Sequence, residues 1–199
     1  MGVDNVHIVR IILFIIVGVY SAYLLYDSIK NHNRGDLIMA IILLTLLVLT
    51  RFVSIVYISG PSMQPNFHTG DCVLVLRTQK VERYDVAVVK WQDKWLVKRV
   101  VGLPSDNLAL SDGYTYINGE EINEPFEYMS GHRNISEIEI PQKHIFIMGD
   151  NRANSHDSRA FGPVATSEIY GKMVVKLTFI SKVPFLSKLI EMMATIQTG

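Results

Sequence analysis

The sequence predicts a mainly β, antiparallel and barrel-like domain that is preceded by two N-terminal transmembrane helices. Two long apolar segments, separated by a polar stretch, fill residues 1–58. After Gly70 the pattern changes to short runs of β-branched and aromatic residues, and no convincing amphipathic helix lies between Ser59 and Phe179. Strand therefore follows strand without intervening helices, which is typical of antiparallel sheets and barrels.

The two apolar segments cover residues 8–26 and 37–58. At about 1.5 Å rise per residue, the first can cross a hydrocarbon core of about 30 Å. The second contains Arg51, whose long side chain can reach the interface, so we extend this span to residue 58. A buried soluble hairpin is the rival interpretation. A cleaved signal peptide is disfavoured because the N-terminus lacks a cluster of positive charge and a second apolar segment follows.

The distribution of positive charge predicts how the chain crosses the membrane. The polar break at residues 27–36 carries Lys30 and Arg34, whereas no lysine or arginine precedes Arg10. By the positive-inside rule the break is cytoplasmic. The N-terminus and everything after residue 58 are then extracytoplasmic, in a multi-pass protein of the cell membrane.

This topology divides the chain into three parts. Residues 1–58 form two transmembrane helices with a cytoplasmic loop at 27–36, and residues 59–181 form an extracytoplasmic β-rich domain. Residues 182–199 form a C-terminal tail. Its stretch "VPFLSKLIEMM" fits a short helix at the membrane interface, and it fits a frayed terminus equally well.

Several short apolar runs in the extracytoplasmic part have the length and composition of strands. Between the alternating residues of "YTYINGEEI", the pair Asn118-Gly119 is a strong signal for a tight hairpin. The other predicted strands lie in "DCVLVLR", "YDVAVVKW", "KWLVKRVVGL", "HIFIMGD" and "GKMVVKLTF".

Composition argues against several classes of function. Lysine plus arginine and aspartate plus glutamate both number 19, so the chain lacks the basic character expected of a nucleic-acid-binding protein. A single cysteine, Cys72, rules out an internal disulfide and a cysteine-rich metal site. No two histidines have the spacing of a helical zinc site. We therefore expect no metal, no cofactor and no nucleic-acid partner.

The stretch "ISGPSMQPNF" places Ser62 in a stiff turn, because Gly60, Pro61 and Pro65 restrict the backbone around it. A serine hydroxyl is a weak nucleophile at neutral pH and needs a base. The sequence offers two kinds. One is a Ser-His-Asp triad built from His68 or His156 with Asp150 or Asp157; the other is a Ser-Lys dyad with Lys98.

Lys98 lies in "WLVKRVVGL", flanked on both sides by apolar residues. In a strand it shares a face with Leu96 and Val100, whereas Arg99 points to the opposite face. A lysine on an inward apolar face is desolvated and loses its proton more readily. Taken alone, the pattern fits a solvated edge lysine as well as a catalytic base.

Three stretches, in order along the chain, resemble the conserved boxes of bacterial type I signal peptidases. "GPSMQP" resembles the nucleophile box, "VKRVVGLPSD" resembles the lysine box, and "GDNRANSHDSRAFGPV" matches every fixed position of the third box. "YDVAVVK" is similar to the strand that precedes the lysine box. The resemblance covers nearly the whole chain and implies a β-rich domain of the signal peptidase type behind membrane anchors.

The resemblance implies a role for five residues. Ser62 matches the nucleophile, and its backbone N–H matches the oxyanion donor. Lys98 matches the general base, and Ser155 matches the serine that orients the lysine amine. Asp157 and Arg159 match a supporting ion pair. Matches to structural positions of the same boxes are Met63, Pro65, Asp150, Asn151 and Arg152.

Two residues depart from the family pattern. Asn66 stands where threonine is usual, outside the dyad. Ser105 stands where glycine is usual, and in a turn that needs a positive φ a serine fits less well than glycine, which weakens the placement of Lys98.

The resemblance implies a membrane-bound serine endopeptidase that removes N-terminal signal peptides from secreted preproteins by a Ser-Lys dyad mechanism. Its partners would be secretory preproteins with small residues at −1 and −3, bound as an extended strand, together with membrane lipid and the secretion translocon.

Two alternatives have weaker support. A membrane-anchored binding module on a peptidase scaffold predicts the loss of Ser62 or Lys98, and both are present. A self-cleaving repressor-type protease has a similar core but is disfavoured by two anchors and by the lack of DNA-binding helices.

Overall fold

The computed structural model describes residues 3–131, 133–178, 185 and 197–198. It divides into two compact units, Met1–Ser54 and Ile55–Gly199, which we describe in turn. The predicted tail at residues 182–199 lies outside the described residues, except for Phe185 and the pair Gln197–Thr198.

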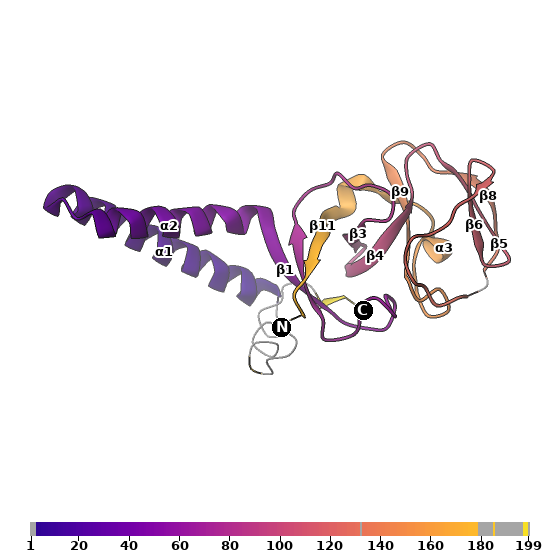
Figure 1. Cartoon of the computed structure of the whole chain (residues 1–199), viewed down its shortest axis with the longest axis horizontal. Helices are drawn as coiled ribbons and strands as arrows, with labels where there is room; N and C mark the ends of the chain where they lie inside the picture. Colours follow the sequence, from indigo (N-terminus) through magenta and orange to yellow (C-terminus); the bar gives the residue numbers. More distant parts are fainter. Residues whose placement is uncertain (1–2, 132, 179–184, 186–196, 199) are drawn as a thin grey trace. The chain divides into compact units, whose positions relative to one another are not determined.

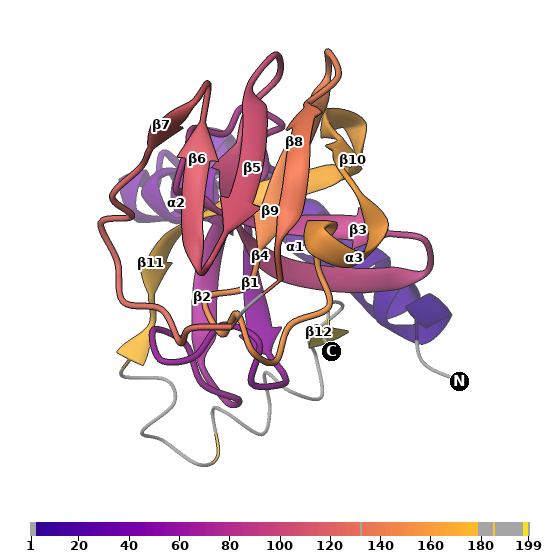
Figure 2. The ribbon, with the colours of Figure 1, turned by 90° about the vertical axis from the view of Figure 1, so that its right-hand side faces the viewer.

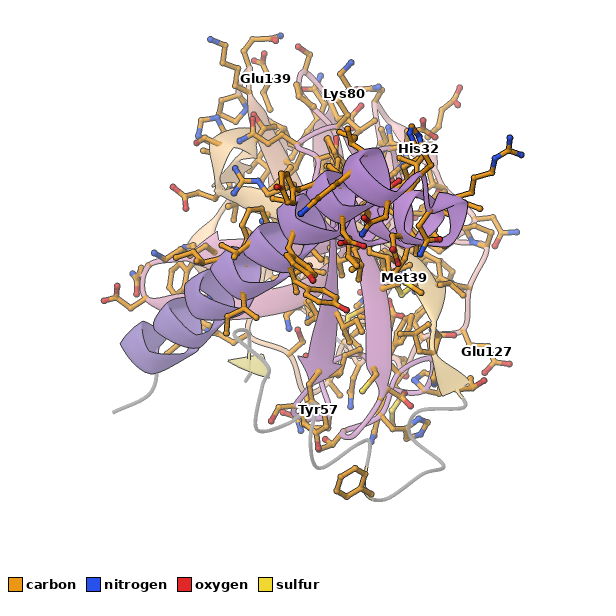
Figure 3. All side chains as sticks on the ribbon, turned by 90° about the vertical axis from the view of Figure 1, so that its left-hand side faces the viewer. His32, Met39, Tyr57, Lys80, Glu127 and Glu139 are labelled. Carbon is orange, nitrogen blue, oxygen red and sulfur yellow. The ribbon has the colours of Figure 1, made fainter. Side chains whose placement is uncertain are left out.

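The first unit is a pair of helices, α1 (Val3–Asn31) and α2 (Arg34–Phe52), that run side by side (Figure 1). His32 lies in the connection between them (Figure 3), and Asn33 caps α2 by accepting a hydrogen bond from Gly35 N–H at 3.0 Å. The small side chains of Ser21 and Ala40 are fully buried, which lets helix backbones approach closely. From Phe14 to Phe52, where burial is described, most large apolar side chains are exposed instead.

Among the described residues, one helix is long and apolar enough to cross a membrane by length and composition, the helix Arg34–Phe52. Its bounds differ from the predicted segment. The helix ends at Phe52, and residues Val53–Ile58 form strand β1, so the predicted extension of the second helix to residue 58 is wrong. Most of β1 is β-branched or aromatic, and such residues favour a strand where neighbouring strands supply backbone partners.

The second unit contains two sheets. The larger has the strand order β10-β9-β4-β12-β1-β2-β11-β3, and β3 also pairs with β4, so this sheet curls back on itself but keeps a free edge at β10. Its strands after β1 are β2 (Cys72–Leu76), β3 (Val86–Trp91), β4 (Lys94–Gly102), β9 (His144–Met148), β10 (Val164–Ala165), β11 (Ile169–Lys176) and β12 (Gln197–Thr198).

The smaller sheet has the order β7-β6-β5-β8, and Figure 2 shows β6, β5 and β8 side by side. Its strands are β5 (Asn107–Ser111), β6 (Tyr114–Ile117), β7 (Glu120–Glu121) and β8 (Ile135–Glu139). Asn118 and Gly119 join β6 to β7 with φ angles of 54° and 83°, so the predicted hairpin turn is confirmed. The short helices are α3 (Ser158–Phe161) and η1 (Thr166–Glu168).

The domain is therefore mainly antiparallel β, as predicted, but its sheets are open rather than closed. The parallel pairings within the sheets are those of β12, which lies between β1 and β4. Thr198 is paired with Ile58 on one side and with Trp95 on the other. Because both pairings are parallel, a chain in this position runs in the same direction as β1 and β4.

Strand β4 lies at the centre of the core. All its residues from Leu96 to Gly102 are buried, and its valines enter three separate apolar clusters. The first cluster also contains Met63 and Phe67, from the turn that follows β1. The core thus fixes both the strand that carries Lys98 and the turn that carries Ser62.

Candidate active site

Ser62 lies in a turn that the rest of the domain holds from two sides. Met63 is fully buried beneath it, and Gly60 enters it with φ 90°, a conformation that glycine adopts without strain. Asn151 binds it from the far side: its N–H donates to Ser62 O at 3.0 Å and its side-chain amide donates to Pro61 O at 3.2 Å. The turn is therefore fixed by packing and by hydrogen bonds from a loop that is remote in sequence.

Lys98 faces this turn from β4. Its side chain is largely inaccessible to solvent, with 1% of the residue exposed. Its Nζ donates to Ser62 Oγ at 2.7 Å and to Val97 O at 3.1 Å. The structure thus places the amine against the serine hydroxyl, at a distance suited to direct proton transfer.

Burial lowers the pKa of Lys98 from its usual value to about 8. Desolvation is the main cause, because a charged amine is disfavoured in an apolar interior. The negative charges of Asp157 and Asp150 act in the opposite direction, and the positive charge of Arg159 adds to the lowering. A substantial fraction of the amine can therefore be neutral near physiological pH, as a proton acceptor must be.

The loop after β9 carries the second group of predicted residues. Asp157 is fully buried and forms a two-point ion pair with Arg159, at 2.8 Å and 2.9 Å. Its carboxylate also accepts a hydrogen bond from Gly149 N–H at 2.9 Å. Burial alone would raise the pKa of Asp157, but Arg159 and the Gly149 N–H outweigh it, so the pKa is lowered. Asp157 is therefore an ionised brace of the loop.

Ser155 lies beside Gly149, next to the Ser62 backbone. A side chain at position 149 would clash with Ser155 Oγ and with Ser62 O, so only glycine permits this approach. Among the described residues, Ser155 Oγ is buried without a hydrogen-bond partner, although the hydroxyl lies near enough to Asp157 to help lower its pKa. Its role toward the lysine amine stays a prediction, because Lys98 Nζ donates to Ser62 and Val97 instead.

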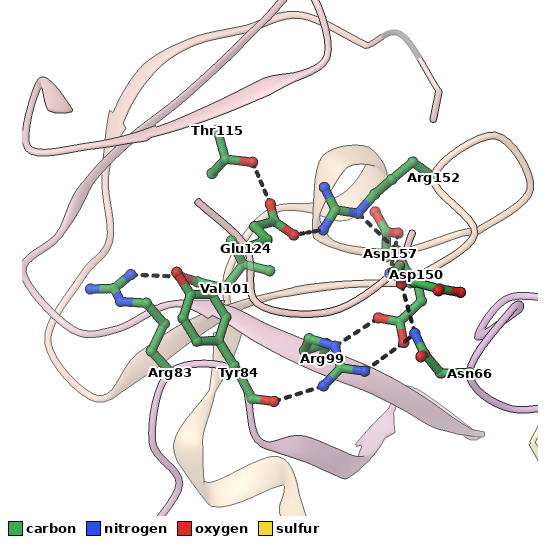
Figure 4. A network of polar contacts seen from close by, with 12 residues as sticks. Asn66, Arg83, Tyr84, Arg99, Val101, Thr115, Glu124, Asp150, Arg152 and Asp157 are labelled. Carbon is green, nitrogen blue, oxygen red and sulfur yellow. Dashed lines mark hydrogen bonds and ion pairs between the residues drawn. The ribbon is translucent and has the colours of Figure 1, made fainter. Parts of the chain in front are cut away.

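A separate buried pair joins the neighbouring residue of β4 to the same loop. Arg99 forms a two-point ion pair with Asp150, at 2.8 Å and 2.6 Å, and donates to Tyr84 O at 2.9 Å (Figure 4). The Phe126 ring covers its guanidinium at 3.9 Å. These contacts give the guanidinium hydrogen-bond acceptors. They also connect β4 to the loop after β9, which binds the turn that contains Ser62.

The two histidines of the alternative triad differ in their contacts. The ring of His156 packs against Trp91 and Phe161, at centroid distances of 5.7 Å and 5.3 Å. His68 is exposed, and its backbone N–H donates to Asp71 Oδ2 at 2.7 Å. Both aspartates of that alternative form the arginine ion pairs described above, so the geometry favours the lysine over a histidine as the base for Ser62.

Three features of the site depend on contacts that are not evident in the sequence. Asn66 donates two hydrogen bonds in the site, to Glu127 O and to Asp150. Glu124 is paired with Arg152. Gly149 is required by close packing. These partners are distant in sequence, so only the fold brings them together.

Within the part of the chain that the structure describes, no cluster of three or more acidic, histidine or cysteine side chains could hold a metal.

Ser105, the second departure from the family pattern, has φ 68°. The turn thus does require the left-handed conformation, and serine adopts it here. Its N–H donates to Ile140 O at 2.9 Å and its hydroxyl accepts from Gln142. Lys98 keeps its buried position on β4 despite this substitution.

Known proteins include relatives of this chain. Residues 31–178 match the family described as "Signal peptidase, peptidase S26". Signal peptidase I V of Bacillus subtilis is 33% identical over 133 residues, which cover 57% of this chain and 79% of that protein. Signal peptidase I of Bacillus caldolyticus is 31% identical over 163 residues, covering 72% of this chain and 89% of that protein.

A crystal structure of a signal peptidase I from Enterococcus faecalis V583 is 26% identical and covers 48% of this chain and 97% of that chain, with a TM-score of 0.42. The family assignment rests on the sequence matches.

Proposed function

Because the chain belongs to the signal peptidase family, peptidase S26, and is thus a serine endopeptidase, we propose that it cleaves with Ser62 as nucleophile and Lys98 as general base. Family membership implies that the substrates are secretory preproteins that carry signal peptides. The observation that carries the dyad is the 2.7 Å contact between a buried Lys98 amine and Ser62 Oγ.

The proposed reaction needs Lys98 in its neutral form. The amine takes the proton of Ser62 Oγ as the oxygen attacks the scissile carbonyl carbon. Negative charge develops on the carbonyl oxygen, where the Ser62 N–H donates to it, a contact of a kind worth about 10²–10³ in rate. The protonated Lys98 then gives its proton to the leaving amine, which departs and leaves an acyl-enzyme. Lys98, neutral again, activates the water that hydrolyses the ester.

The position of β12 supports the proposal that the substrate binds as an extended strand. It is paired in parallel with β1 and β4, the strands that lead to Ser62 and carry Lys98. A peptide held in the same direction would continue from the level of Thr198, paired with Trp95, toward Lys98 three residues further along β4. We expect small substrate residues at −1 and −3.

We also place the enzyme in the cell membrane, with lipid around two N-terminal spans and the β-rich domain extracytoplasmic. The apolar helix Arg34–Phe52 supports an anchor. With Cys72 replaced by serine, a cysteine at Asn31 should resist a membrane-impermeant thiol reagent applied to intact cells. One at Tyr114, which is exposed, should react. The opposite labelling pattern would reverse the orientation.

The decisive experiment is cleavage of a preprotein in detergent by the full-length enzyme, with the product N-terminus identified by mass spectrometry. The Ser62→Ala and Lys98→Ala variants should both fold and both be inactive, while binding of the preprotein is retained. Cleavage by folded Ser62→Ala at the wild-type rate would refute the proposed nucleophile. If the wild-type protein binds the preprotein but does not cleave it, the binding-module alternative is favoured instead.

A further inference from the structure

The turn that carries Ser62 has a second anchor, four residues beyond the nucleophile. Asn66 Nδ2 donates to Asp150 Oδ2 at 2.8 Å (Figure 4) and to Glu127 O at 2.7 Å. An amide NH₂ has two hydrogens, so both are used. Both partners are acceptors, so the amide is oriented unambiguously: the flipped amide would set its oxygen against a carboxylate and a carbonyl.

The first of these bonds connects the turn to the strand of the base. Asp150 Oδ2, which accepts from Asn66, also accepts from Arg99 Nη2 at 2.6 Å. Arg99 follows Lys98 directly on β4. A short chain of charge-assisted bonds therefore runs from the nucleophile turn, through one carboxylate, to the residue next to the base.

The second bond connects the turn to residues 124–131, which we call the strap. The strap lies along the loop after β9: Met129 N–H donates to Asp150 O and Met129 O accepts from Arg152 N–H, both at 2.9 Å. The Phe126 ring covers Arg99, and the Tyr128 ring covers Arg152 at 4.6 Å. The exposed strap is thus held on the loop by two arginines, and Asn66 binds it from the turn.

The two anchors of the turn act at different points. Asn151 binds the backbone of Pro61 and Ser62 themselves, whereas Asn66 binds beyond them. Buried Met63 and Phe67 also hold the turn, and Lys176 Nζ donates to Asn66 O at 3.2 Å. Loss of the Asn66 side-chain bonds would therefore shift Ser62 Oγ relative to Lys98 Nζ without releasing the turn. The two anchors bind the turn to Asp150 and Asn151, which are successive residues of one loop, and together they fix the direction in which the hydroxyl points.

We propose that Asn66 is a positioning residue, which sets the contact between Ser62 and Lys98 by bonding the nucleophile turn to both Asp150 and the strap. Threonine, usual at this position in the family that the sequence resembles, has a single hydroxyl hydrogen and can donate to one acceptor at a time. This chain therefore couples the strap to the nucleophile through a bond that a threonine could make only by giving up the other.

The inference rests on the proposed dyad and predicts a graded series in the full-length enzyme. Asn66→Asp has nearly the same shape but sets a carboxylate against Asp150 and Glu127 O. We expect its kcat to fall by about 10²-fold, the effect of a displacement of about 1 Å at a reacting group. Asn66→Ala, which loses both donors without repulsion, should lose about tenfold. Asn66→Thr, which keeps one donor, should be the most active of the three.

The measurements separate positioning from folding. KM for a preprotein peptide should change less than twofold throughout the series, and thermal unfolding should show that each variant is folded at the assay temperature. Asn154→Ala is the matched control. This exposed asparagine lies in the loop after β9, close in sequence to Asp150, and its hydrogen bond to Asn151 Oδ1 is made by its backbone N–H, which alanine keeps. It should retain wild-type kcat.

The outcomes are distinct from those that test the dyad. If Ser62→Ala and Lys98→Ala are inactive while folded Asn66→Asp keeps wild-type kcat, the positioning role is refuted and the dyad stands. If Asn66→Asp and Asn66→Thr lose kcat equally, the proposal that kcat depends on the number of hydrogen bonds donated by residue 66 is refuted. A fall in kcat that follows the order Asp, Ala, Thr at constant KM supports the inference.

Discussion

On one face of β4 the Lys98 amine contacts a serine hydroxyl and a carbonyl; on the other, the Arg99 guanidinium contacts a carboxylate, a carbonyl and an aromatic ring. Both residues are buried. The lysine has no carboxylate bonded to it in these contacts, so desolvation dominates and lowers its pKa. The arginine has a carboxylate partner that it contacts at two points. Burial thus prepares one cation to lose its proton and makes the other a structural tie.

Activity should be lost when the lysine position is given the chemistry of its neighbour. Lys98→Arg places a group that cannot act as a base beside Ser62. We expect it to be as inactive as Lys98→Ala. The loss in kcat should be at least the factor of about 10²–10⁴ that general-base catalysis usually contributes. Circular dichroism should show that both variants fold. Appreciable turnover by folded Lys98→Arg would mean that another group is the base.

The converse change removes the partner of Arg99. Asp150→Asn leaves a buried guanidinium without its countercharge, which should lower the free energy of unfolding by about 3–5 kcal/mol. Urea unfolding in detergent measures it. Lys172→Ala, which removes the partly exposed pair with Asp85, is the control and should cost about 0–1 kcal/mol. Equal effects of the two substitutions would show that burial of the Arg99 pair is not what matters.

The pH dependence tests the lysine face alone. The neutral amine is the active form, so activity should be lost as pH falls through the lowered pKa of about 8. Cleavage of a neutral peptide, measured as kcat/KM, should therefore drop about tenfold for each pH unit below that value and level off above it. Replacing His156 or His68 should leave the midpoint unchanged. A midpoint that moves with either histidine would identify a histidine base.

The smallest expected effect concerns the arginine face. Arg99→Lys keeps the charge but loses the planar fork that bonds both carboxylate oxygens. We expect a loss of about 1–3 kcal/mol in the free energy of unfolding, because one buried charge-assisted bond is left unmade. The acid limb of the pH profile should not move, since Lys98 is desolvated by other groups. A limb shifted by one pH unit would show that the two faces are coupled.

The local patterns of the sequence identify much of this arrangement. Alternation along "WLVKRVVGL" predicts that Lys98 and Arg99 point to opposite faces, and the structure has both residues buried on β4. The resemblance to known boxes predicts that Ser62 and Lys98 act together. Their Oγ and Nζ atoms lie 2.7 Å apart. Asn118-Gly119 predicts a hairpin turn because its φ requirements are local.

Features set by tertiary contacts are much harder to predict. The residues of β1 are as apolar as the helix before them, so hydropathy alone extends the helix to residue 58; the sheet partners decide otherwise. Asn66 is bonded to Asp150, 84 residues away, and nothing in either local pattern indicates it. Open and closed sheets likewise share one strand pattern, because closure depends on which edges meet.

Strand β12 has a consequence for the shape that a bound peptide can take. It lies between β1 and β4, so those strands are separated there by two strand spacings, about 9.6 Å. An α-helix with its side chains is about 10–12 Å wide and has already used its backbone N–H and C=O groups internally. A substrate that took the place of β12, as proposed above, would therefore be selected by conformation before it was selected by side chain: a helical segment would not fit, and the same residues would fit once they unwound. Discrimination of this kind requires no particular residue in the peptide, only a stretch that loses its helix at little cost.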